Sequence, residues 1–434
     1  MLTTEIASTS PTTTPDTMRW TPATRVAFRF CAVYFGLTIL FTQLFSAVFQ
    51  LPSPIFLTGV QNLFAVVGER IFGVDPITLS FSGSGDKLID WVQAATLLLF
   101  AFVSSLVWSL ASRRDSHPRA NKWFRLLVRF ALGATLVRYG FGKIIPLQMP
   151  TLFLARLVEP YGHFSPMGVL WSSIGASPAY ESFIGSVELL GGVLLFFQRT
   201  TLLGSLISLA AAGQVFVLNM TYDVPVKLLS FHLVLLSLVL IAPYARNLCD
   251  LLLLHRPLVP AAEPPLGSTQ RRRRYWFAVQ AAYGGVLVLL AFSTAVFQYS
   301  HYGAGAPQSP LFGIWNVEQM TIDGELLPPL VTDRSRWRRV IMQAPTGVVF
   351  QRMDDTFDRY SAEFAKDGAT LKVTPSDGKT SSTLTYRRAT ADRLVMEGTI
   401  GKQLVHMELR QVDLNSFLLN TRGFHWVQEV PFNR

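Results

Sequence analysis

The sequence predicts a polytopic α-helical membrane protein followed by an all-β, barrel-like soluble domain. Half of its 434 residues are hydrophobic, only 15% are charged and the mean hydropathy is positive, which is typical of membrane proteins. Long apolar runs end near residue 298, and from about Gly303 the chain is polar and rich in turns. We expect a disordered cytoplasmic tail over residues 1–22, a transmembrane helical domain over 23–298, and an extracytoplasmic antiparallel β-barrel domain over 303–434.

Seven apolar stretches are long enough, or nearly long enough, to cross a bilayer, which takes about 20 residues of helix. They are residues 26–48, 88–110, 126–145, 181–197, 202–218, 224–242 and 276–297. Six or eight spans are the alternatives. Two outer loops are long: one contains the apolar run 56–72, predicted as an interfacial helix, and residues 147–180 form either a functional loop or a cap.

The net charge of +10 is distributed as membrane topology requires. Basic residues gather in alternate loops: Arg19, Arg25, Arg29, Arg113, Arg114, Arg119, Lys122, Arg125, Arg199, Arg246, Arg256 and the run 271–274. Cytoplasmic loops are enriched in arginine and lysine. The pattern therefore predicts a multi-pass protein with a cytoplasmic amino terminus and an outer carboxyl-terminal domain, with the lipid bilayer and not nucleic acid as its partner.

Three ionisable side chains, Arg138, Glu188 and His232, lie inside three predicted spans. A charge in hydrocarbon costs about 2.5–3.5 kcal/mol on the insertion scale, so it usually pairs, lines a wet cavity or does chemistry. At 1.5 Å per helical residue, all three lie roughly 10–12 Å from the outer ends of their spans. Ala134 and Gly142 flank Arg138, and Gly185 and Gly192 flank Glu188. Such small residues favour close helix contact. We infer an Arg138–Glu188 ion pair with His232 and Gln214 nearby.

This polar layer has a structural and a functional interpretation. A buried ion pair fixes the register of neighbouring helices, whereas a pocket open to the outer face binds a substrate. The candidate substrate-binding residues around its rim are Tyr139, Lys143, Gln214, Tyr222, Asp223 and Lys227. Asp223 is equally explained as a helix N-cap before Pro225, and Lys143 and Lys227 as interfacial snorkelling residues.

Residue counts argue against several cofactors. A bis-histidine haem needs two facing imidazoles, and His232 is the single histidine deep in a predicted span. Cys31 and Cys249 are the two cysteines, and the sequence has no Cys/His metal spacing, phosphate-binding glycine loop or Gly-x-Ser-x-Gly motif. We expect no haem, no iron–sulfur cluster and no other metal site.

Beyond Gly303, nine short segments alternate polar and apolar residues. They are residues 314–322, 338–343, 347–353, 357–364, 370–375, 381–387, 393–397, 403–411 and 416–420, with hairpin breaks at Asp323-Gly324, Asp367-Gly368 and Asp377-Gly378. Consecutive short strands favour an up-and-down antiparallel barrel. Gly313-Ile314-Trp315 and Arg422 resemble the Gly-x-Trp opening and late arginine of lipocalin-like barrels, which implies that Arg422 packs over Trp315. The alternative is an ordinary core tryptophan.

The middle of the chain resembles the DoxX family of bacterial membrane proteins. The resemblance rests on five segments: 138–143 (RYGFGK), 159–162 (EPYG), 177–180 (SPAY), 188–192 (ELLGG) and 219–227 (NMTYDVPVK). It implies a four-helix membrane core over about 126–258, with about three extra spans, in a bacterial inner membrane. The family is associated with thiosulfate:quinone oxidoreduction and with redox stress.

The expected function is therefore that of a component of a membrane redox or quinone-linked system, an oxidoreductase subunit if it is an enzyme. Quinone is the expected cofactor class, and a redox protein the expected partner. In this hypothesis Arg138 orients an anionic or quinone oxygen, Glu188 balances its charge or carries a proton, and His232 relays one. The alternative is a non-enzymatic scaffold or a ligand-binding protein that uses the outer β-domain. Small inward-facing strand residues would leave a ligand cavity there, and bulky ones would fill it.

Overall fold

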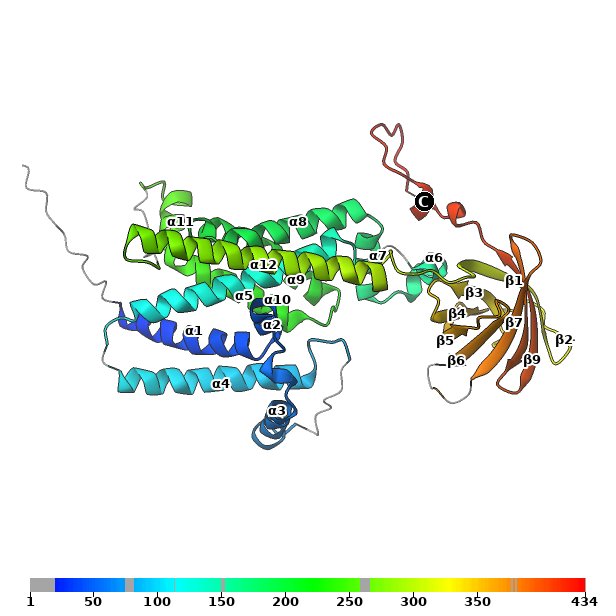
Figure 1. The fold of residues 1–434 in the computed structure, drawn as a ribbon, viewed down its shortest axis with the longest axis horizontal. Helices are drawn as coiled ribbons and strands as arrows, with labels where there is room; N and C mark the ends of the chain where they lie inside the picture. Colours follow the sequence, from blue (N-terminus) through cyan, green and yellow to red (C-terminus); the bar gives the residue numbers. More distant parts are fainter. Residues whose placement is uncertain are drawn as a thin grey trace, which may run out of the picture. The chain divides into compact units, whose positions relative to one another are not determined.

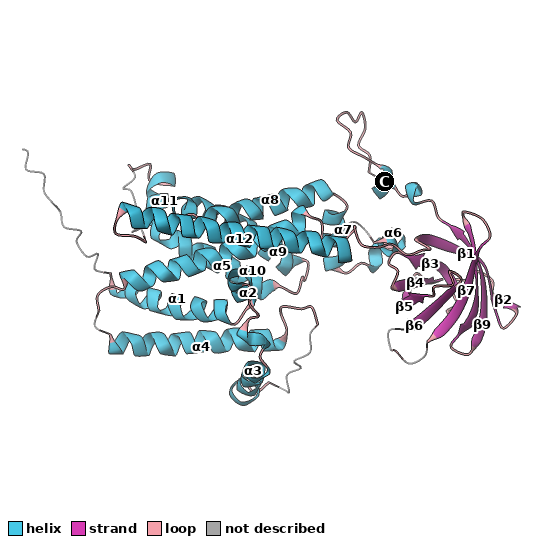
Figure 2. Ribbon diagram, viewed as in Figure 1, coloured by secondary structure: helices cyan, strands magenta, loops and turns pink. Residues whose placement is uncertain are grey.

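The computed structural model describes residues 20–74, 82–112, 114–149, 153–257, 266–375, 378 and 381–433. Most of the predicted amino-terminal tail lies outside these residues. The chain divides into two compact units. The first unit comprises Met1–Val137, Glu188–Met220 and Val224–Val288, and the second comprises Arg138–Val187, Thr221–Asp223 and Leu289–Arg434. Figures 1 and 2 show that helices make up the amino-terminal part of the chain and that strands are confined to the carboxyl-terminal part.

The first predicted span forms two helices, α1 (Pro22–Leu40) and α2 (Gln43–Phe49). The break comes at Thr42, whose hydroxyl donates to the Thr38 carbonyl (2.7 Å) and accepts from the Leu44 N–H (3.4 Å). Helix α4 (Leu88–Ala111) runs alongside α1 (Figure 1). Helix α3 (Thr58–Ile71) covers most of the predicted interfacial helix and leaves most of its surface exposed.

The remaining helices correspond to the other predicted spans and to the second outer loop. They are α5 (Pro118–Ile144), α6 (Leu154–Val158), α7 (Pro166–Gly175), α8 (Pro178–Leu195), α9 (Thr201–Thr221), α10 (Lys227–Ile241), α11 (Ala245–Leu252) and α12 (Gln270–Tyr302), with short 3-10 turns at Pro54–Phe56, Tyr161–His163, Gln198–Thr200 and Ala242–Tyr244. The turn Gln198–Thr200 joins α8 to α9, as the sequence predicts.

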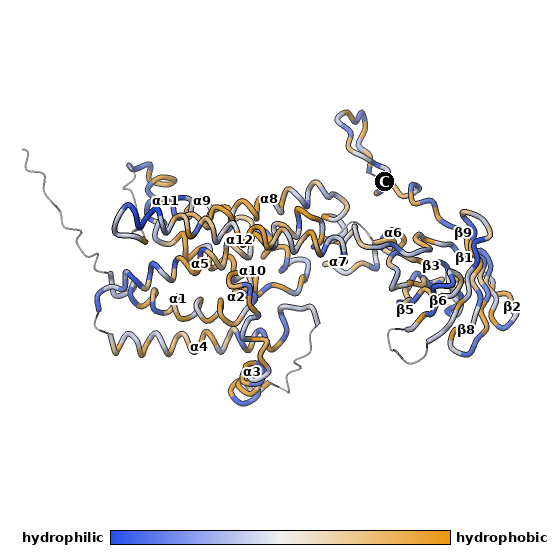
Figure 3. The backbone as a smooth tube through the Cα atoms, viewed as in Figure 1, coloured by the Kyte–Doolittle hydropathy of each residue, from blue (hydrophilic) through white to orange (hydrophobic). Residues whose placement is uncertain are grey.

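Within the described residues, five helices are long and apolar enough to cross a membrane. Their bounds are Pro22–Leu40, Leu88–Ala111, Gln198–Thr221, Lys227–Leu252 and Gln270–Tyr302. The chain is therefore a membrane-associated protein. Helices α5 and α8 cover the other two predicted spans but carry more polar side chains. Figure 3 shows apolar colour along most helices and polar colour at the amino end of α12.

Glycines bring α5 and α8 into close antiparallel contact. A Cβ atom on Gly192 would lie 2.7 Å from the Gly133 carbonyl oxygen. Seven residues further along α5, and seven back along α8, a Cβ on Gly185 would lie 2.7 Å from the Gly140 carbonyl oxygen. The predicted small-residue contact is confirmed at Gly185 and Gly192. At Gly142 the prediction is wrong, because a Cβ there would meet no atom within 4 Å.

The carboxyl-terminal region is a closed, antiparallel, up-and-down barrel, as predicted. Its strands are β1 (Gly313–Ile322), β3 (Trp337–Met342), β4 (Gly347–Arg352), β5 (Phe357–Phe364), β6 (Thr370–Pro375), β7 (Ser382–Arg388), β8 (Arg393–Ile400) and β9 (Gln403–Gln411). Each pairs with the next, and β1 pairs with β9 to close the barrel. Strand β2 (Glu325–Leu326) was not predicted; it follows the Asp323-Gly324 turn and extends β1 as a hairpin.

The strand predicted at residues 416–420 is wrong. This segment forms a 3-10 turn, Leu414–Ser416, and a short helix, α13 (Leu418–Thr421). The carboxylate of Asp413 accepts the N–H of Asn415 at 2.9 Å and starts the turn. Because β9 already pairs with β1, the barrel has no free edge for a further strand. The turn predicted at Asp377-Gly378 includes Asp377, which lies outside the described residues.

Bulky apolar side chains fill the barrel interior. The fully buried members of this core include Trp315, Met320, Met342, Phe350, Leu371, Leu384, Met396 and Met407. The Trp315 indole N–H donates to the Leu311 carbonyl at 2.9 Å. The predicted packing of Arg422 over this ring is wrong: the guanidinium of Arg388 lies 5.6 Å from the ring centre, while that of Arg422 lies 4.4 Å from the ring of Phe432.

Candidate functional site

The two central residues of the predicted polar layer differ in exposure. Glu188 is 5% exposed, whereas the side chain of Arg138 is exposed. The register of α5 against α8 places Glu188 level with Val137. Arg138 belongs to the second unit and Glu188 to the first, so their ion pair stays a prediction. The exposure of Arg138 contrasts with the helix-contact face that the sequence predicts for it.

His232 has a structural explanation inside the first unit. Its Nδ1 lies 2.7 Å from the Leu228 carbonyl oxygen, which can only accept, so Nδ1 carries the proton. Its Nε2 then accepts from the Tyr34 hydroxyl at 2.8 Å. Both side chains are buried, and the bond joins α10 to α1. Gln214, predicted as a neighbour of His232, is exposed.

The predicted N-cap of α10 at Asp223 is wrong. The helix begins at Lys227, and the carboxylate of Asp86 accepts the N–H groups of Lys227 (2.7 Å) and Leu228 (2.9 Å). The ammonium of Lys227 lies 3.9 Å from the same carboxylate. Asp223 is exposed and adopts a left-handed φ of 52°, and Tyr222 is half-buried. The carboxylate that caps this helix therefore comes from a distant loop.

A buried polar cluster lies in the second unit around Lys143 and Glu181, which are 3% and 0% exposed. The positive charge of Lys143 acts on the Glu181 carboxylate, and its ammonium lies 5.8 Å from the centre of the Tyr139 ring. One carboxylate oxygen, Oε1 of Glu181, accepts the Met149 N–H at 3.0 Å. Among the described residues, the other oxygen has no hydrogen-bond partner, and neither has the buried Oε1 of Gln148, whose side chain is otherwise half-buried.

A cavity of about 320 Å³ adjoins this cluster. Its wall includes Met149, the residue whose N–H binds Glu181. Apolar and polar side chains both line it: Met149, Phe153, Arg156, Ser165, Met167, Trp171 and Ser172. The Arg156 guanidinium forms an ion pair with Glu159 at 2.5 Å. This volume lies at the small end of the range for ligand pockets, which combine apolar walls with a few polar groups.

Helix α6, which carries Arg156, is held against the barrel within the second unit. The Leu154 N–H donates to Gln343 Oε1 at 2.8 Å, and Gln351 Nε2 donates to the Val158 carbonyl at 3.1 Å. Four apolar residues form a buried cluster in this contact: Leu154, Ala155, Ile314 and Ile341. Ile314 and Ile341 lie on the outer side of the barrel, so α6 covers an apolar patch there. The barrel therefore fixes one wall of the cavity.

Four polar residues of these contacts were not predicted from the sequence: Glu181, Gln148, Tyr34 and Asp86. Glu181 follows Pro178 in the first turn of α8. In the sequence it was the first residue of a predicted span and was therefore assigned to the end of that span. Gln148 and Asp86 lie in loops, and Tyr34 is an aromatic residue in an apolar helix. No local spacing marks any of them. A cue was available for Glu181, because it adds a carboxylate to a predicted span that already contains Glu188.

Comparison with known proteins identifies a bacterial relative over part of the chain. No family model matches the chain, and no solved structure matches it. The chain is 36% identical over 129 residues to the uncharacterized protein YwoB of Bacillus subtilis (strain 168), over 77% of that protein. The chain belongs to the YwoB family. The matched segment makes up 30% of this chain, so most of the chain lies outside the similarity to YwoB.

Proposed function

We propose that the protein binds a quinol-class ligand in the cavity beside Glu181, as a component of a membrane redox system. The observation that carries the proposal is the cavity whose wall residue Met149 donates its N–H to Glu181, together with the unpartnered acceptors Oε2 of Glu181 and Oε1 of the adjacent residue Gln148. The resemblance of residues 138–143 and 188–192 to the DoxX family supports the same class of ligand.

Hydrogen bonding favours a ligand with hydroxyl groups. A buried acceptor without a donor costs about 1–3 kcal/mol, and a quinol ring carries two hydroxyl donors. The apolar cavity residues Phe153, Met167 and Trp171 suit the ring face. The Lys143 ammonium beside Glu181 supplies the opposite charge. Oxidation of the quinol to the quinone would pass two electrons to a redox protein partner and release two protons, of which the Glu181 carboxylate can receive one and water the other.

Titration calorimetry of the purified protein with a short-chain quinol tests the proposal. Glu181→Gln replaces the unpartnered acceptor by a donor, so the affinity is expected to fall about tenfold or more. Trp171→Ala removes ring contact and is expected to weaken binding as well. Glu363→Gln changes a carboxylate of the same type on the exposed face of the barrel and should leave the affinity unchanged. Equal affinities in all four proteins would contradict the proposal.

The roles predicted for Arg138 and Glu188 remain part of the hypothesis. Glu188 is buried and could still carry a proton. The bond between His232 and Tyr34 favours a structural role for His232 over a relay. Glu188→Gln should therefore change the pH dependence of quinol oxidation if the residue carries a proton, whereas the same substitution should change only stability if the residue is structural.

We also propose a bacterial inner-membrane location with the amino terminus in the cytoplasm and the barrel outside. Support comes from the first unit, where Arg25 pairs with Asp115 at 3.1 Å and Arg125 donates to the Leu240 carbonyl at 3.4 Å. Segments predicted as cytoplasmic are therefore neighbours. In a Cys31→Ala background, an impermeant maleimide should label Cys249 in inverted vesicles and not in spheroplasts. Labelling in spheroplasts alone would reverse the orientation.

A scaffold is the second candidate function. The filled barrel core disfavours a ligand inside the barrel, and the contact with α6 fixes the barrel to the outer loop. A filled barrel that is fixed to the outer loop could serve as a rigid surface to which another protein binds. A wild-type protein that folds normally but binds no quinol would favour this candidate.

A further inference from the structure

Large apolar side chains are exposed on the carboxyl-terminal segment, residues 418–433, which follows the barrel. Trp426 is 91% exposed, and its ring meets that of Phe424 edge to face with centres 4.9 Å apart. Groups of exposed apolar side chains mark contacts with proteins or with membranes. Six large apolar residues of the segment are half or more exposed: Leu418, Leu419, Phe424, Trp426, Val427 and Val430.

The arginine at the base of this segment holds it in a loop. The guanidinium of Arg422 lies 3.4 Å from His425 Nε2 and donates to Gln428 Oε1 at 3.3 Å. It also lies 4.4 Å from the centre of the Phe432 ring. These contacts join residues of the same segment, so they shape the loop and leave the Trp426 side chain outside it. A loop with a preset shape loses less conformational entropy when it binds.

The carboxyl-terminal segment leaves the barrel at the end where the chain enters it from α12. The Val412 N–H donates to the Ile314 carbonyl at 2.8 Å, and the Gln411 side chain donates to the Phe312 carbonyl at 3.1 Å. Ile314 lies near the start of β1, the first strand after α12, and Gln411 is the last residue of β9. The base of the segment is therefore next to the entry point of the barrel.

This end of the barrel is tethered close to the end of α12. The helix ends at Tyr302, and the Ser309 N–H already donates to the Gln343 carbonyl, just after β3, at 3.0 Å. Even a fully extended chain between Tyr302 and Ser309 spans at most about 25 Å. The actual link is shorter because it turns, with the Ala306 N–H donating to the Gly303 carbonyl at 3.0 Å. The segment therefore starts near the point where α12 ends.

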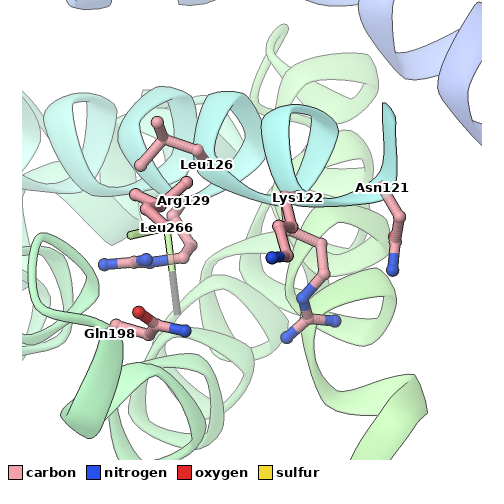
Figure 4. A pocket seen from close by; sticks show the side chains of 7 residues that line it. Asn121, Lys122, Leu126, Arg129, Gln198 and Leu266 are labelled. Atoms are coloured by element: carbon pink, nitrogen blue, oxygen red, sulfur yellow. The ribbon is translucent and has the colours of Figure 1, made fainter. Parts of the chain in front are cut away.

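The two ends of α12 lie at opposite boundaries of a bilayer. Near its amino end, the rings of Trp276 and Trp123 meet edge to face with centres 5.7 Å apart. Lys122 lines a cavity with both rings, and Figure 4 shows it with Gln198 in the adjoining pocket. Tryptophan is enriched at the headgroup boundary. From Trp276 to Tyr302 the helix rises about 39 Å, which exceeds the roughly 30 Å of the hydrocarbon core. Tyr302 therefore reaches the headgroups of the other leaflet.

We propose that the carboxyl-terminal segment inserts Phe424 and Trp426 into the headgroup region of the leaflet where α12 ends, and so holds the barrel against the membrane. Aromatic side chains suit this region, and Glu429 is the single acidic residue in 418–433. A protein partner would also suit exposed apolar side chains. The tether favours lipid, because it keeps the segment at a high effective concentration beside the bilayer. The proposal does not depend on the quinol cavity.

Fluorescence quenching of the full-length protein in lipid nanodiscs tests the proposal. In a Cys31→Ala and Cys249→Ala background, Val430→Cys carries an environment-sensitive dye and keeps both aromatic side chains. Nitroxide-labelled phosphatidylcholine should quench most of its emission. A nitroxide near the headgroup end of the acyl chain should quench more than one near the methyl end, since interfacial segments lie about 5–10 Å deep. Leu326→Cys, an exposed apolar position at the other end of β1, is the matched control and should stay bright.

Two double variants show whether the aromatic side chains cause the insertion. Phe424→Ser with Trp426→Ser should lower the quenching at Val430→Cys to the level of the control. Leu326→Ser with Leu404→Ser removes exposed apolar side chains from the far end of the barrel and should leave the quenching unchanged.

Three results would overturn the proposal. Equal quenching at Val430→Cys and Leu326→Cys would show no preference for the carboxyl-terminal segment. Quenching that survives Phe424→Ser with Trp426→Ser would show that the two rings do not anchor it. A dye at Val430→Cys that stays bright in nanodiscs would refute the lipid and assign the exposed side chains to a protein partner.

Discussion

Two buried polar groups that link helices in the first unit are fully hydrogen-bonded, although Thr38 Oγ1 in that unit has no partner among the described residues, whereas two buried acceptors near the cavity of the second unit have none. In the first unit, His232 has a partner at each ring nitrogen, and Asp86 accepts two backbone N–H groups. In the second unit, Glu181 and Gln148 each have a buried oxygen without a partner among the described residues, next to a cavity. Satisfied groups stabilise helix packing, whereas unsatisfied acceptors beside a cavity indicate a ligand site. This contrast, rather than depth in a predicted span, separates structural from functional candidates.

The largest expected loss of unfolding free energy comes from a fully hydrogen-bonded group of the first unit. Asp86→Ala removes the carboxylate that caps α10 and leaves two N–H groups without their acceptor, so we expect a loss of about 2–3 kcal/mol in unfolding free energy. Denaturant titration in detergent, followed by circular dichroism, measures it. Asp115→Ala removes an exposed ion pair with Arg25 and should cost less than about 0.5 kcal/mol. Similar losses in both variants would refute the capping role.

Tyr34→Phe tests the link between α1 and α10. The substitution keeps the ring and removes the donor to His232 Nε2, so the unfolding free energy should fall by about 1–2 kcal/mol. The matched control is Tyr275→Phe, because the Tyr275 side chain is exposed. If Tyr34→Phe is as stable as the control, His232 does not depend on this bond, and its role as a proton relay regains support.

A pH effect is expected from His117, which lies in the loop between α4 and α5. Burial and the charges of Arg29 and Arg114 lower the pKa of His117 below its ordinary value of 6.5. The unfolded chain therefore binds a proton at His117 more readily than the folded protein does. The contribution of neutral His117 to the unfolding free energy is fully present above pH 6.5, and it is lost as the pH falls through the lower pKa that His117 has in the folded protein.

Thermal melting from pH 7 to 5 measures this effect, which should be smaller than that of Tyr34→Phe. His117→Gln should flatten the decline on the acid side, whereas His255→Gln, at an exposed site, should keep the wild-type profile. An unchanged profile for His117→Gln would show that other groups cause the acid sensitivity.

The smallest change in unfolding free energy is expected for an acceptor without a partner in the second unit. Gln148→Met removes an acceptor that has no partner and keeps a side chain of similar size, so the unfolding free energy should change by less than about 0.5 kcal/mol or rise slightly. The affinity for quinol should fall at the same time. A loss of stability above about 1 kcal/mol would mean that Gln148 is a structural residue, and the comparison would then fail at this position.

Much of the fold could be predicted because it depends on local patterns. Hydropathy located the helices, and alternation located the eight strands that close the barrel. The contact of α5 and α8 at Gly185 and Gly192 followed from small-residue spacing. The prediction failed where the same local sequence pattern was compatible with two structures. The segment 416–420 has strand-like residues, but β9 had already closed the barrel with β1.

The candidate site was much less predictable than the fold. Lys143 was a predicted binding residue and does lie in the buried cluster, but its partner Glu181 was missed. Helical depth placed Arg138, Glu188 and His232 at one level. Depth along a helix says nothing about direction around it, and Arg138 turned out to be exposed.

The sequence by itself determined that apolar helices precede a period-two barrel, because hydrophobic periodicity is a property of neighbouring residues. Tertiary structure alone decided which polar groups meet. Tyr34 and His232 are 198 positions apart, and Asp86 and Lys227 are 141 apart. Arg388 rather than Arg422 lies over Trp315 for the same reason. Hydrogen bonds and cation–ring contacts act over a few ångströms, so partners far apart in the chain are set by how the elements pack.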